Sequence, residues 1–297
     1  MKKNEEGVEL APPGEPAPEP DTGDRQYLRF SRLNRILHVV MIVSFMSLAL
    51  TGMTLKFSYT RWASVLSHLL GGYESAGYIH RFAAVMMFCI FFTHITDIVR
   101  QKRREHRSWK SMIFGQDSML FNRSDLRDFI ASVKWFIGKG PRPAYGRWTY
   151  WEKFDYFAVF WGIAVIGSTG LMLWFPEFFT HVIPGSFINV ATIIHSDEAL
   201  LAVGFIFTVH FFNTHFRPEK FPMDIVIFTG RMDVEELKRD KTAEYESLLK
   251  SGKLKKYLVE PYQPIVIRAV KTFGWIALTI GFGIVVSIIY AMVFAYR

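Results

Sequence analysis

The stretch ATIIHSDEALLAVGFIFTVHFFNTH, residues 191–215, combines a membrane-like composition with three histidines, His195, His210 and His215. It is near the length, about 20 residues, that an α-helix needs to cross the hydrocarbon core of a bilayer. Lipid offers backbone groups no hydrogen-bond partners, so a segment of this kind is expected to be helical. An imidazole inside a membrane is costly and usually functional. The stretch therefore predicts a transmembrane helix whose histidines have a function.

Four further apolar stretches have a similar length, and half of the 297 residues are hydrophobic. The sequence thus predicts an all-α integral membrane bundle of five transmembrane helices, a four-helix core plus one C-terminal helix. The segment 1–27, rich in Pro, Gly and acidic residues, is predicted to be a disordered cytoplasmic tail. The other expected units are a membrane domain at 28–230 with spans near 34–57, 77–99, 154–175 and 191–215, a cytoplasmic helical loop at 231–268, and the fifth helix within 269–297.

Cysteine usage narrows the classes of cofactor site. Cys89, inside the second apolar stretch, is the only cysteine of the chain. A disulfide framework, a CxxC metal site and the CxxCH attachment site of a c-type haem are therefore excluded. The first apolar stretch begins too late and is too long for a cleaved signal peptide.

Basic residues are distributed unevenly between the connecting segments. The N-terminal segment through Arg35 holds six Lys and Arg, and the 100–153 and 217–271 loops hold more, whereas 58–76 holds only Arg61 and 176–190 holds none. The positive-inside rule then predicts a cytoplasmic N-terminus and a C-terminus on the opposite side, which is the periplasmic side if the membrane is a bacterial inner membrane. Basic residues that set the orientation of the spans are thus a sufficient explanation of the net charge of +8. Nucleic-acid binding is not expected, because the basic residues flank membrane spans instead of forming one domain.

The histidines lie at matched depths on three predicted helices. His80 and His195 stand at the outer ends of helices two and four, His94 and His210 at their inner ends, and His38 near the inner end of helix one. His80 and His94 are separated by about 21 Å along a helix and about 40° around it, and His195 and His210 by about 22 Å and 60°. Helices two and four therefore present imidazoles toward one seam. Stacked haem b groups, each with iron between imidazoles of facing helices, need this arrangement, and His80 with His195 is the first pair it predicts.

A haem-free transporter or proton channel is the alternative, because such proteins also gather histidines in the membrane. Metal-ion transporters usually add carboxylates at mid-membrane, whereas Asp97, Asp197 and Glu198 lie near predicted helix ends. Glycines such as Gly52 and Gly170 would let a flat macrocycle approach a helix closely, although helix packing alone explains any single one of them.

Several motifs resemble one known family. They are RLNRILH ending at His38, ALTG ending at Gly52, YIHRF around His80, KFDYFAVFWG at 153–162, and TIIHSDEALLAVGFIFTVH from Thr192 to His210. These patterns are similar to those of the cytochrome b (gamma) subunits of membrane-bound formate dehydrogenases and nickel–iron hydrogenases. That family consists of quinone-reactive, di-haem membrane proteins. The resemblance runs through the first four helices, roughly residues 28–230.

The resemblance implies two haem b groups and a role for each ligand histidine. The outer haem would be held by His80 and His195, and the inner haem by His38 and His210. It also implies a site for menaquinone or ubiquinone beside the inner haem, which we expect near the start of helix three.

The residues expected around the quinone are Tyr150, Glu152 and His94. The chain would then be the quinone-reactive electron-transfer subunit of an oxidoreductase complex. Its expected partners are membrane lipid, a quinone, and a periplasmic multihaem cytochrome c or iron–sulfur dehydrogenase subunit.

The sequence also departs from the family pattern. His195 and His210 are one residue further apart than the family's ligands, and His94 and His215 are additional. An inner pair of His94 and His210 is therefore a rival to His38 and His210, and a third haem on His94 or His215 stays open. The segment HFFNTHFRPEKFPMD, 210–224, is similar to a bacterial subgroup that accompanies multihaem cytochromes c.

Overall fold

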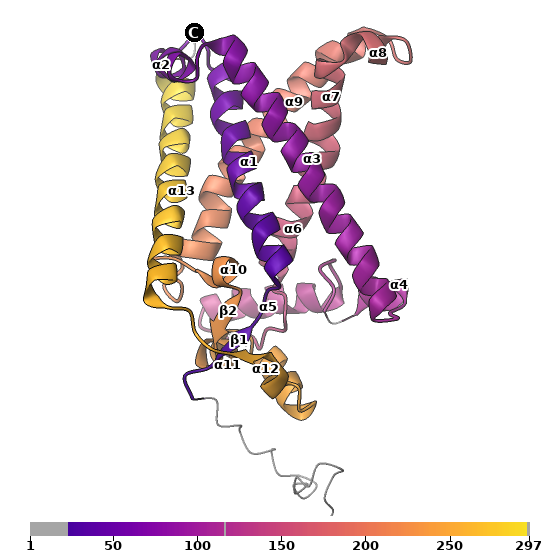
Figure 1. The fold of residues 1–297 in the computed structure, drawn as a ribbon, viewed down its shortest axis with the longest axis vertical. Coiled ribbons are helices and arrows are strands. Elements are labelled where there is room, and N and C mark those ends of the chain that lie inside the picture. Colours follow the sequence, from indigo (N-terminus) through magenta and orange to yellow (C-terminus); the bar gives the residue numbers. More distant parts are fainter. Residues whose placement is uncertain (1–22, 116, 296–297) are drawn as a thin grey trace, which may run out of the picture.

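The computed structural model describes residues 23–115 and 117–295, which form an elongated helical bundle (Figure 1). Five helical segments of this described part are long and apolar enough to cross a membrane. They confirm the predicted all-α membrane bundle. The spans are Arg32–Lys56 (α1), Tyr73–Arg104 (α3), Tyr150–Trp174 (α6, η1 and α7), Ser186–Phe216 (α9, η2 and η3) and Pro264–Ala295 (α13 and η5).

Within three of these spans the helix changes type. The third span consists of α6 (Tyr150–Gly162), a π-helical turn η1 (Ile163–Gly167) and α7 (Ser168–Trp174). The fourth consists of α9 (Ser186–Phe205) and two π turns, η2 (Ile206–His210) and η3 (Phe212–Phe216). In the fifth, α13 (Pro264–Tyr290) is followed by η5 (Ala291–Ala295).

Two of the five spans, the first and the third, begin at polar capping residues, which apolar composition cannot reveal. Before α6, the Thr149 side chain accepts from the Glu152 main-chain amide, and Glu152 Oε2 accepts from the Thr149 amide at 2.8 Å. This reciprocal capping box satisfies two amides that the first helical turn leaves without partners. Ser31 caps α1 through a single bond, which its hydroxyl accepts from the Asn34 amide. Caps of this kind explain why the third span starts at Tyr150, four residues before the predicted start.

The shorter elements gather at the two ends of the bundle (Figure 1). One end, where α1 begins, holds most of them; the other holds α2 (Arg61–Leu69) and α8 (Pro176–Thr180). At the first end lie α4 (Trp109–Phe114), α5 (Arg123–Phe136), α10 (Val226–Thr229), α11 (Val234–Asp240), α12 (Thr242–Lys250), η4 (Leu254–Tyr257) and three short strands.

The fifth span packs on the four-helix core through small residues. One buried apolar cluster joins α1, the fourth span and α13. A Cβ atom added at Gly281 would lie 2.6 Å from a ring carbon of Phe207 and 2.8 Å from one of Phe211. Only glycine therefore lets α13 approach η2 this closely, as in other membrane helix pairs. The fifth span is thus attached to the α1 and η2 side of the core.

A three-stranded antiparallel sheet connects segments that are far apart in the chain. Strand β1 (Gln26–Leu28) lies between β2 (Arg231–Asp233) and β3 (Leu258–Val259), with Tyr27 opposite Met232 on one side and Leu258 on the other. Residues 26 and 27 of the predicted tail are therefore strand, while residues 1–22 lie outside the described part. We call the sheet with α11, α12 and η4 the inner subdomain.

The inner subdomain has its own apolar core, which the prediction of a helical loop at 231–268 did not include. Leu237 is 0 % exposed and Tyr27 is 2 % exposed, and both belong to one buried cluster with Met232 and Leu254. Burying side chains of this size contributes about 1.5–3 kcal/mol each. The subdomain is therefore a folded unit at the end of the bundle.

Buried charges join the inner subdomain to the third span. Arg29 donates to Glu244 and to Glu152, each at 3.2 Å, and Lys241 donates to the second oxygen of Glu152 at 2.6 Å. Burial lowers the pKa of Lys241 to about 8. Removing one partner of a buried ion pair usually costs about 3–5 kcal/mol, because the other charge is left without compensation. The cluster therefore holds β1, α12 and the start of α6 in one arrangement.

Candidate functional site

The outer pair of predicted ligands is brought together by α3 and α9. The ring centres of His80 and His195 lie 6.2 Å apart, with their planes at 71°. Two imidazole nitrogens that share a metal at roughly 2.0 Å each, with roughly 1.1 Å more from nitrogen to ring centre, place the ring centres about 6.2 Å apart. The observed separation fits a metal held between these two rings.

The protonation of His80 follows from its partner Thr51 on α1. The Thr51 hydroxyl donates its only proton to the Ser47 carbonyl at 2.6 Å, and its oxygen lies 2.9 Å from His80 Nδ1. Since the hydroxyl proton is already used, Nδ1 must be the donor to Thr51. The neutral ring then carries its lone pair on Nε2, the nitrogen that binds a metal.

His195 is held in the same way by the third span. Its Nδ1 lies 2.9 Å from the Ile166 main-chain carbonyl, which can only accept a hydrogen bond. Thr169, which donates to the Val165 carbonyl at 2.7 Å, adds a second acceptor for Nδ1 at 3.4 Å. His195 therefore also leaves Nε2 with its lone pair.

A glycine follows each of these threonines and makes room for the imidazole. A Cβ atom added at Gly52 would lie 3.3 Å from His80 Cε1, and one added at Gly170 would lie 2.9 Å from His195 Cε1. The threonine of each pair orients a ring, and the glycine lets that ring lie against the neighbouring helix. The sequence had suggested these glycines for helix packing or a macrocycle; the structure places them against the imidazoles themselves.

At the inner end, His210 is oriented by a carboxylate. Its Nδ1 lies 2.9 Å from Oδ2 of Asp155 on α6, so this ring too presents Nε2. A carboxylate that accepts from a metal-binding histidine fixes the ring and raises its basicity. The other carboxylate oxygen, Asp155 Oδ1, is buried without a hydrogen-bond partner in the described part of the chain.

His38 stands near His210 and His215, because both of those imidazoles act electrostatically on it. Its ring packs edge-on against Phe228 of α10, with the centres 6.2 Å apart. No group in residues 23–115 or 117–295 hydrogen-bonds to the His38 ring. The structure thus brings His38 and His210 to one level of the bundle.

The two alternate histidines have different surroundings. His94 uses Nε2 for a contact of 3.0 Å with the Tyr156 hydroxyl. His215 is 9 % exposed, packs against Phe211, and its buried Nδ1 has no partner among the described residues. His94 therefore already engages its usual metal-binding nitrogen, whereas His215 is a buried ring beside the inner pair.

The extra residue between His195 and His210 is accommodated by a widened helical turn. Residues 206–210 form the π turn η2, in which hydrogen bonds run from i to i+5 and one additional residue enters the turn. The 15 residues from His195 to His210 therefore turn roughly as 14 α-helical residues do, about 40° out of phase instead of 60°. The π turn η2 thus offsets the additional residue of this interval.

An apolar pocket of about 520 Å³ opens between α5, α6 and η2. Asp155 lines it, and the same side chain bonds to His210, so the pocket lies one hydrogen bond from this histidine. Tyr150, one of the residues expected around a quinone, also lines the pocket. Among the other lining residues are Phe121, Leu126, Phe129, Trp151, Phe154, Phe205 and Val209.

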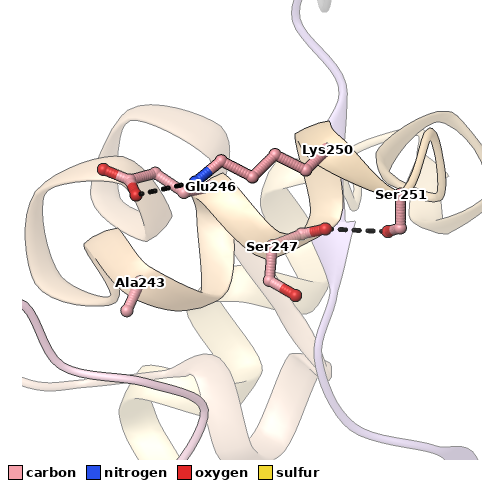
Figure 2. A pocket seen from close by; sticks show the side chains of 5 residues that line it. All are labelled: Ala243, Glu246, Ser247, Lys250 and Ser251. Carbon is pink, nitrogen blue, oxygen red and sulfur yellow. Dashed lines mark hydrogen bonds and ion pairs between the residues drawn. The ribbon is translucent and has the colours of Figure 1, made fainter.

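Glu152 and His94 are not among the residues that line this pocket. Glu152 is instead occupied by Thr149, Arg29 and Lys241 as a cap and ion-pair partner. Figure 2 shows a second depression, of about 410 Å³, on α12, where Lys250 pairs with Glu246 at 3.8 Å and Ser251 donates to the Ser247 carbonyl at 2.8 Å. Both of these bonds stay within α12 and its C-terminal cap.

Sequence reasoning did not single out Thr51 and Thr169 as partners of histidines. The signal that could have found them is the Thr-Gly pair, which occurs at 51–52 and again at 169–170. Each pair lies on a helix that packs against the helix of an outer histidine. Which histidine each pair would face depends on helix packing, and the sequence alone does not give that.

Comparison with known proteins agrees with the sequence motifs. No curated protein matches the chain. Residues 9–115, which include the first two spans with His38, His80 and His94, match the family model of prokaryotic cytochrome b561. This match confirms the resemblance to a cytochrome b subunit family and indicates a membrane haem-binding electron-transfer cytochrome.

Proposed function

We propose that this protein transfers electrons across a membrane between the quinone pool and a periplasmic redox partner, through two b-type haems. The single observation that best supports the proposal is the shared state of His80, His195 and His210. Each has Nδ1 held by an acceptor and Nε2 left as a metal-binding nitrogen. Three fixed imidazoles on membrane-spanning helices need a ligand that uses all of them, and stacked haems are that ligand.

In this proposal His80 and His195 hold the outer haem, and His38 and His210 hold the inner one. Each haem would supply one-electron redox chemistry, and the protein supplies binding, orientation and a dry medium. His38 is preferred to His94 for the inner pair because the Tyr156 hydroxyl already lies at hydrogen-bonding distance from His94 Nε2. His38 has no competing hydrogen bond from the described residues.

The quinone is proposed to bind in the pocket between α5, α6 and η2. Its volume lies within the usual range for small-molecule sites, and its lining is mostly aromatic and aliphatic, as a quinone ring requires. Asp155 supplies a polar group at the edge nearest to His210. Menaquinone and ubiquinone both suit this chemistry.

The end of the bundle that carries the inner subdomain is proposed to face the cytoplasm. The basic residues of the 100–153 and 217–271 loops gather there, and the loops around α2 and α8 at the other end contain few. The periplasmic partner, a multihaem cytochrome c or an iron–sulfur subunit, would then approach the outer haem. Reporter proteins fused to the C-terminus test this orientation. An alkaline phosphatase fusion, which is active only in the periplasm, should be active. An inactive phosphatase fusion, together with a fluorescent protein fusion that fluoresces, would show that the C-terminus is cytoplasmic.

Haem content tests the ligand assignment. We expect the purified protein to show a b-type reduced-minus-oxidised spectrum, and His80→Ala and His195→Ala each to lose one of two haems. His38→Ala should lose the other, whereas His94→Ala and the surface control His181→Ala should keep both. A wild-type protein without haem would favour the haem-free transporter. If His94→Ala loses a haem and His38→Ala keeps both, the inner haem is held by His94 and His210 instead.

Filling the pocket tests the quinone assignment separately. Leu126→Trp should keep both haems but abolish haem reduction or oxidation by a quinol or quinone analogue, because the indole occupies the pocket. Val133→Trp, at an exposed position on the same helix outside the pocket, is the matched control. Equal quinone-linked rates in both variants would place the quinone elsewhere.

A further inference from the structure

Three arginines converge on one tyrosine where the first and fifth spans begin. Arg35 donates through Nη1 to the Tyr262 hydroxyl at 2.9 Å and to the Thr229 carbonyl at 2.8 Å. The guanidinium carbon of Arg231 lies 3.5 Å from the centre of the Tyr262 ring. Arg32, the first residue of α1, stands one helical turn before Arg35. We call these four residues the arginine cluster.

In the described part of the chain, the arginine cluster has none of the carboxylate partners that several other arginines of this end have. Arg29, Arg142 and Arg147 each pair with at least one carboxylate. Among the described residues, no carboxylate lies within ion-pair distance of the cluster's arginines. Arg231 donates instead to a main-chain carbonyl, that of Glu260. The side chain of Glu260 pairs with Arg25 at 3.4 Å.

The pKa of the Tyr262 hydroxyl reflects the same excess of positive charge. The hydrogen bond from Arg35 lowers the pKa of the Tyr262 hydroxyl, partial burial opposes the shift, and the charges of Arg35, Arg231 and Arg32 lower it further. No carboxylate of the described chain contributes to this balance. Three positive charges thus surround one hydroxyl, with donor groups of Arg32 and Arg231 left for a further acceptor.

The position of the arginine cluster indicates where that acceptor comes from. The cluster lies at the start of α1 and two residues before α13, where two membrane spans begin. Exposed apolar side chains follow at once on both helices, with Ile36 49 % and Ile265 61 % exposed. A group with an anionic head and hydrocarbon chains matches this succession of charge and apolar surface.

We propose that Arg32, Arg35, Arg231 and Tyr262 bind the phosphate group of an anionic phospholipid in the leaflet at this end of the bundle. Guanidinium groups suit this ligand because their planar forks match phosphate oxygens. The bound phosphate would join α1, the 229–231 segment and the start of α13. His38 lies on α1 and packs on Phe228, so the lipid would stabilise the surroundings of that histidine.

Lipid retention by the purified full-length protein tests the proposal. Native mass spectrometry would compare phosphatidylglycerol with phosphatidylcholine in the wild type and in Arg32→Gln/Arg231→Gln. Arg35 is kept, because it also bonds to Thr229. Each charge-assisted contact to the phosphate contributes about a factor of ten, so the double variant should lose phosphatidylglycerol affinity by about a hundredfold. Arg103→Gln/Arg104→Gln, exposed and at the same end, is the control that removes equal charge.

The outcomes separate the possible sources of the phosphate. Retention of phosphatidylglycerol by the double variant at the wild-type level would overturn the proposal, and so would an equal loss in the control variant. If inorganic phosphate raises the melting temperature of the wild type as much as phosphatidylglycerol does, the ligand is free phosphate and the lipid assignment is wrong. Haem content measured on every variant shows that the fold is retained and keeps this test distinct from that of the proposed function.

Discussion

At the scale of single residues, the helix carbonyls decide what the outer histidines can do. Thr51 and Thr169 each donate to a carbonyl four residues earlier on their own helix, which leaves only their acceptor capacity for an imidazole. A hydroxyl could otherwise act as donor or acceptor. This local bond therefore sets the tautomer of His80, and at His195 it supports the tautomer that the Ile166 carbonyl fixes.

Gly170→Ala tests how closely the outer ring is fitted. The new methyl group would lie 2.9 Å from His195 Cε1, so the imidazole must move. Its Nε2 atom would then no longer face His80. We expect the outer haem to be lost or bound about 10–100-fold more weakly, as for other changes to the residues that orient metal ligands. Gly204→Ala on α9 meets no atom within 4 Å and should bind haem like the wild type. Equal haem content and affinity in the two variants would contradict the fit described here.

Histidines could be found from the sequence because an imidazole in a membrane stretch stands out against its apolar neighbours. The groups that orient them could not. Threonine is common in membrane helices and often bonds only to its own backbone, as Thr54 does with the Leu50 carbonyl. Its position says nothing about a histidine on another helix.

At the scale of elements, the π turns are the feature that periodicity could not predict. Apolar residues fill every side of these spans, so one inserted residue leaves the composition of each face almost unchanged. The single sign in the sequence was the 15-residue interval between His195 and His210. The turn η1 similarly contains Ile166, whose carbonyl receives the His195 hydrogen bond, in agreement with the frequent occurrence of π turns at functional sites.

Deleting one residue tests the role of η2. Removal of Thr208, an exposed residue within this π turn, should restore a regular α-helix and keep His210 on its present side. We expect both haems to remain. Removal of Val43, an exposed residue of the regular helix α1, should turn His38 by about 100° relative to Thr51 and cost one haem. Haem loss in the Thr208 deletion together with full content in the Val43 deletion would refute this account.

At the scale of the whole molecule, the spans were predictable and the inner subdomain was not. Five long apolar stretches indicate five spans whatever their packing. Strands of two or three residues carry no usable pattern, and their pairing depends on residues more than two hundred positions apart. Arg29 likewise reads as one more basic residue near the membrane, although it is 3 % exposed and binds two carboxylates.

Alkaline titration tests the junction between the inner subdomain and the bundle. Burial, then the charge of Glu244, raises the pKa of Tyr27 from its ordinary 10.0 to about 12. Because the folded pKa exceeds the unfolded one, this contribution to stability is complete below pH 10 and is lost as the pH rises through 12. The melting temperature of the wild type should therefore fall over this interval.

Tyr27→Phe isolates that contribution. The variant lacks the hydroxyl that donates to Glu244 and accepts from Arg147, so it should be less stable at pH 8 by roughly 1.5–3 kcal/mol and show a smaller decrease above pH 10. Tyr59→Phe, at an exposed tyrosine, should follow the wild type at both pH values. Parallel melting curves for the wild type and Tyr27→Phe across pH 10–12 would be inconsistent with the raised pKa.

The position of β1 in its sheet also imposes an order on biosynthesis. Residues 26–28 leave the ribosome before the first span is made, yet both partner strands follow the fourth span. The sheet can therefore close only after four crossings have been inserted, and only if their number is even, so that β1 and β2 emerge on the same side. A nascent chain that skips or inverts one span leaves Arg29 across the membrane from Glu244. A closed sheet of three very short strands is thus the sign that the first four spans have been inserted in the correct orientation.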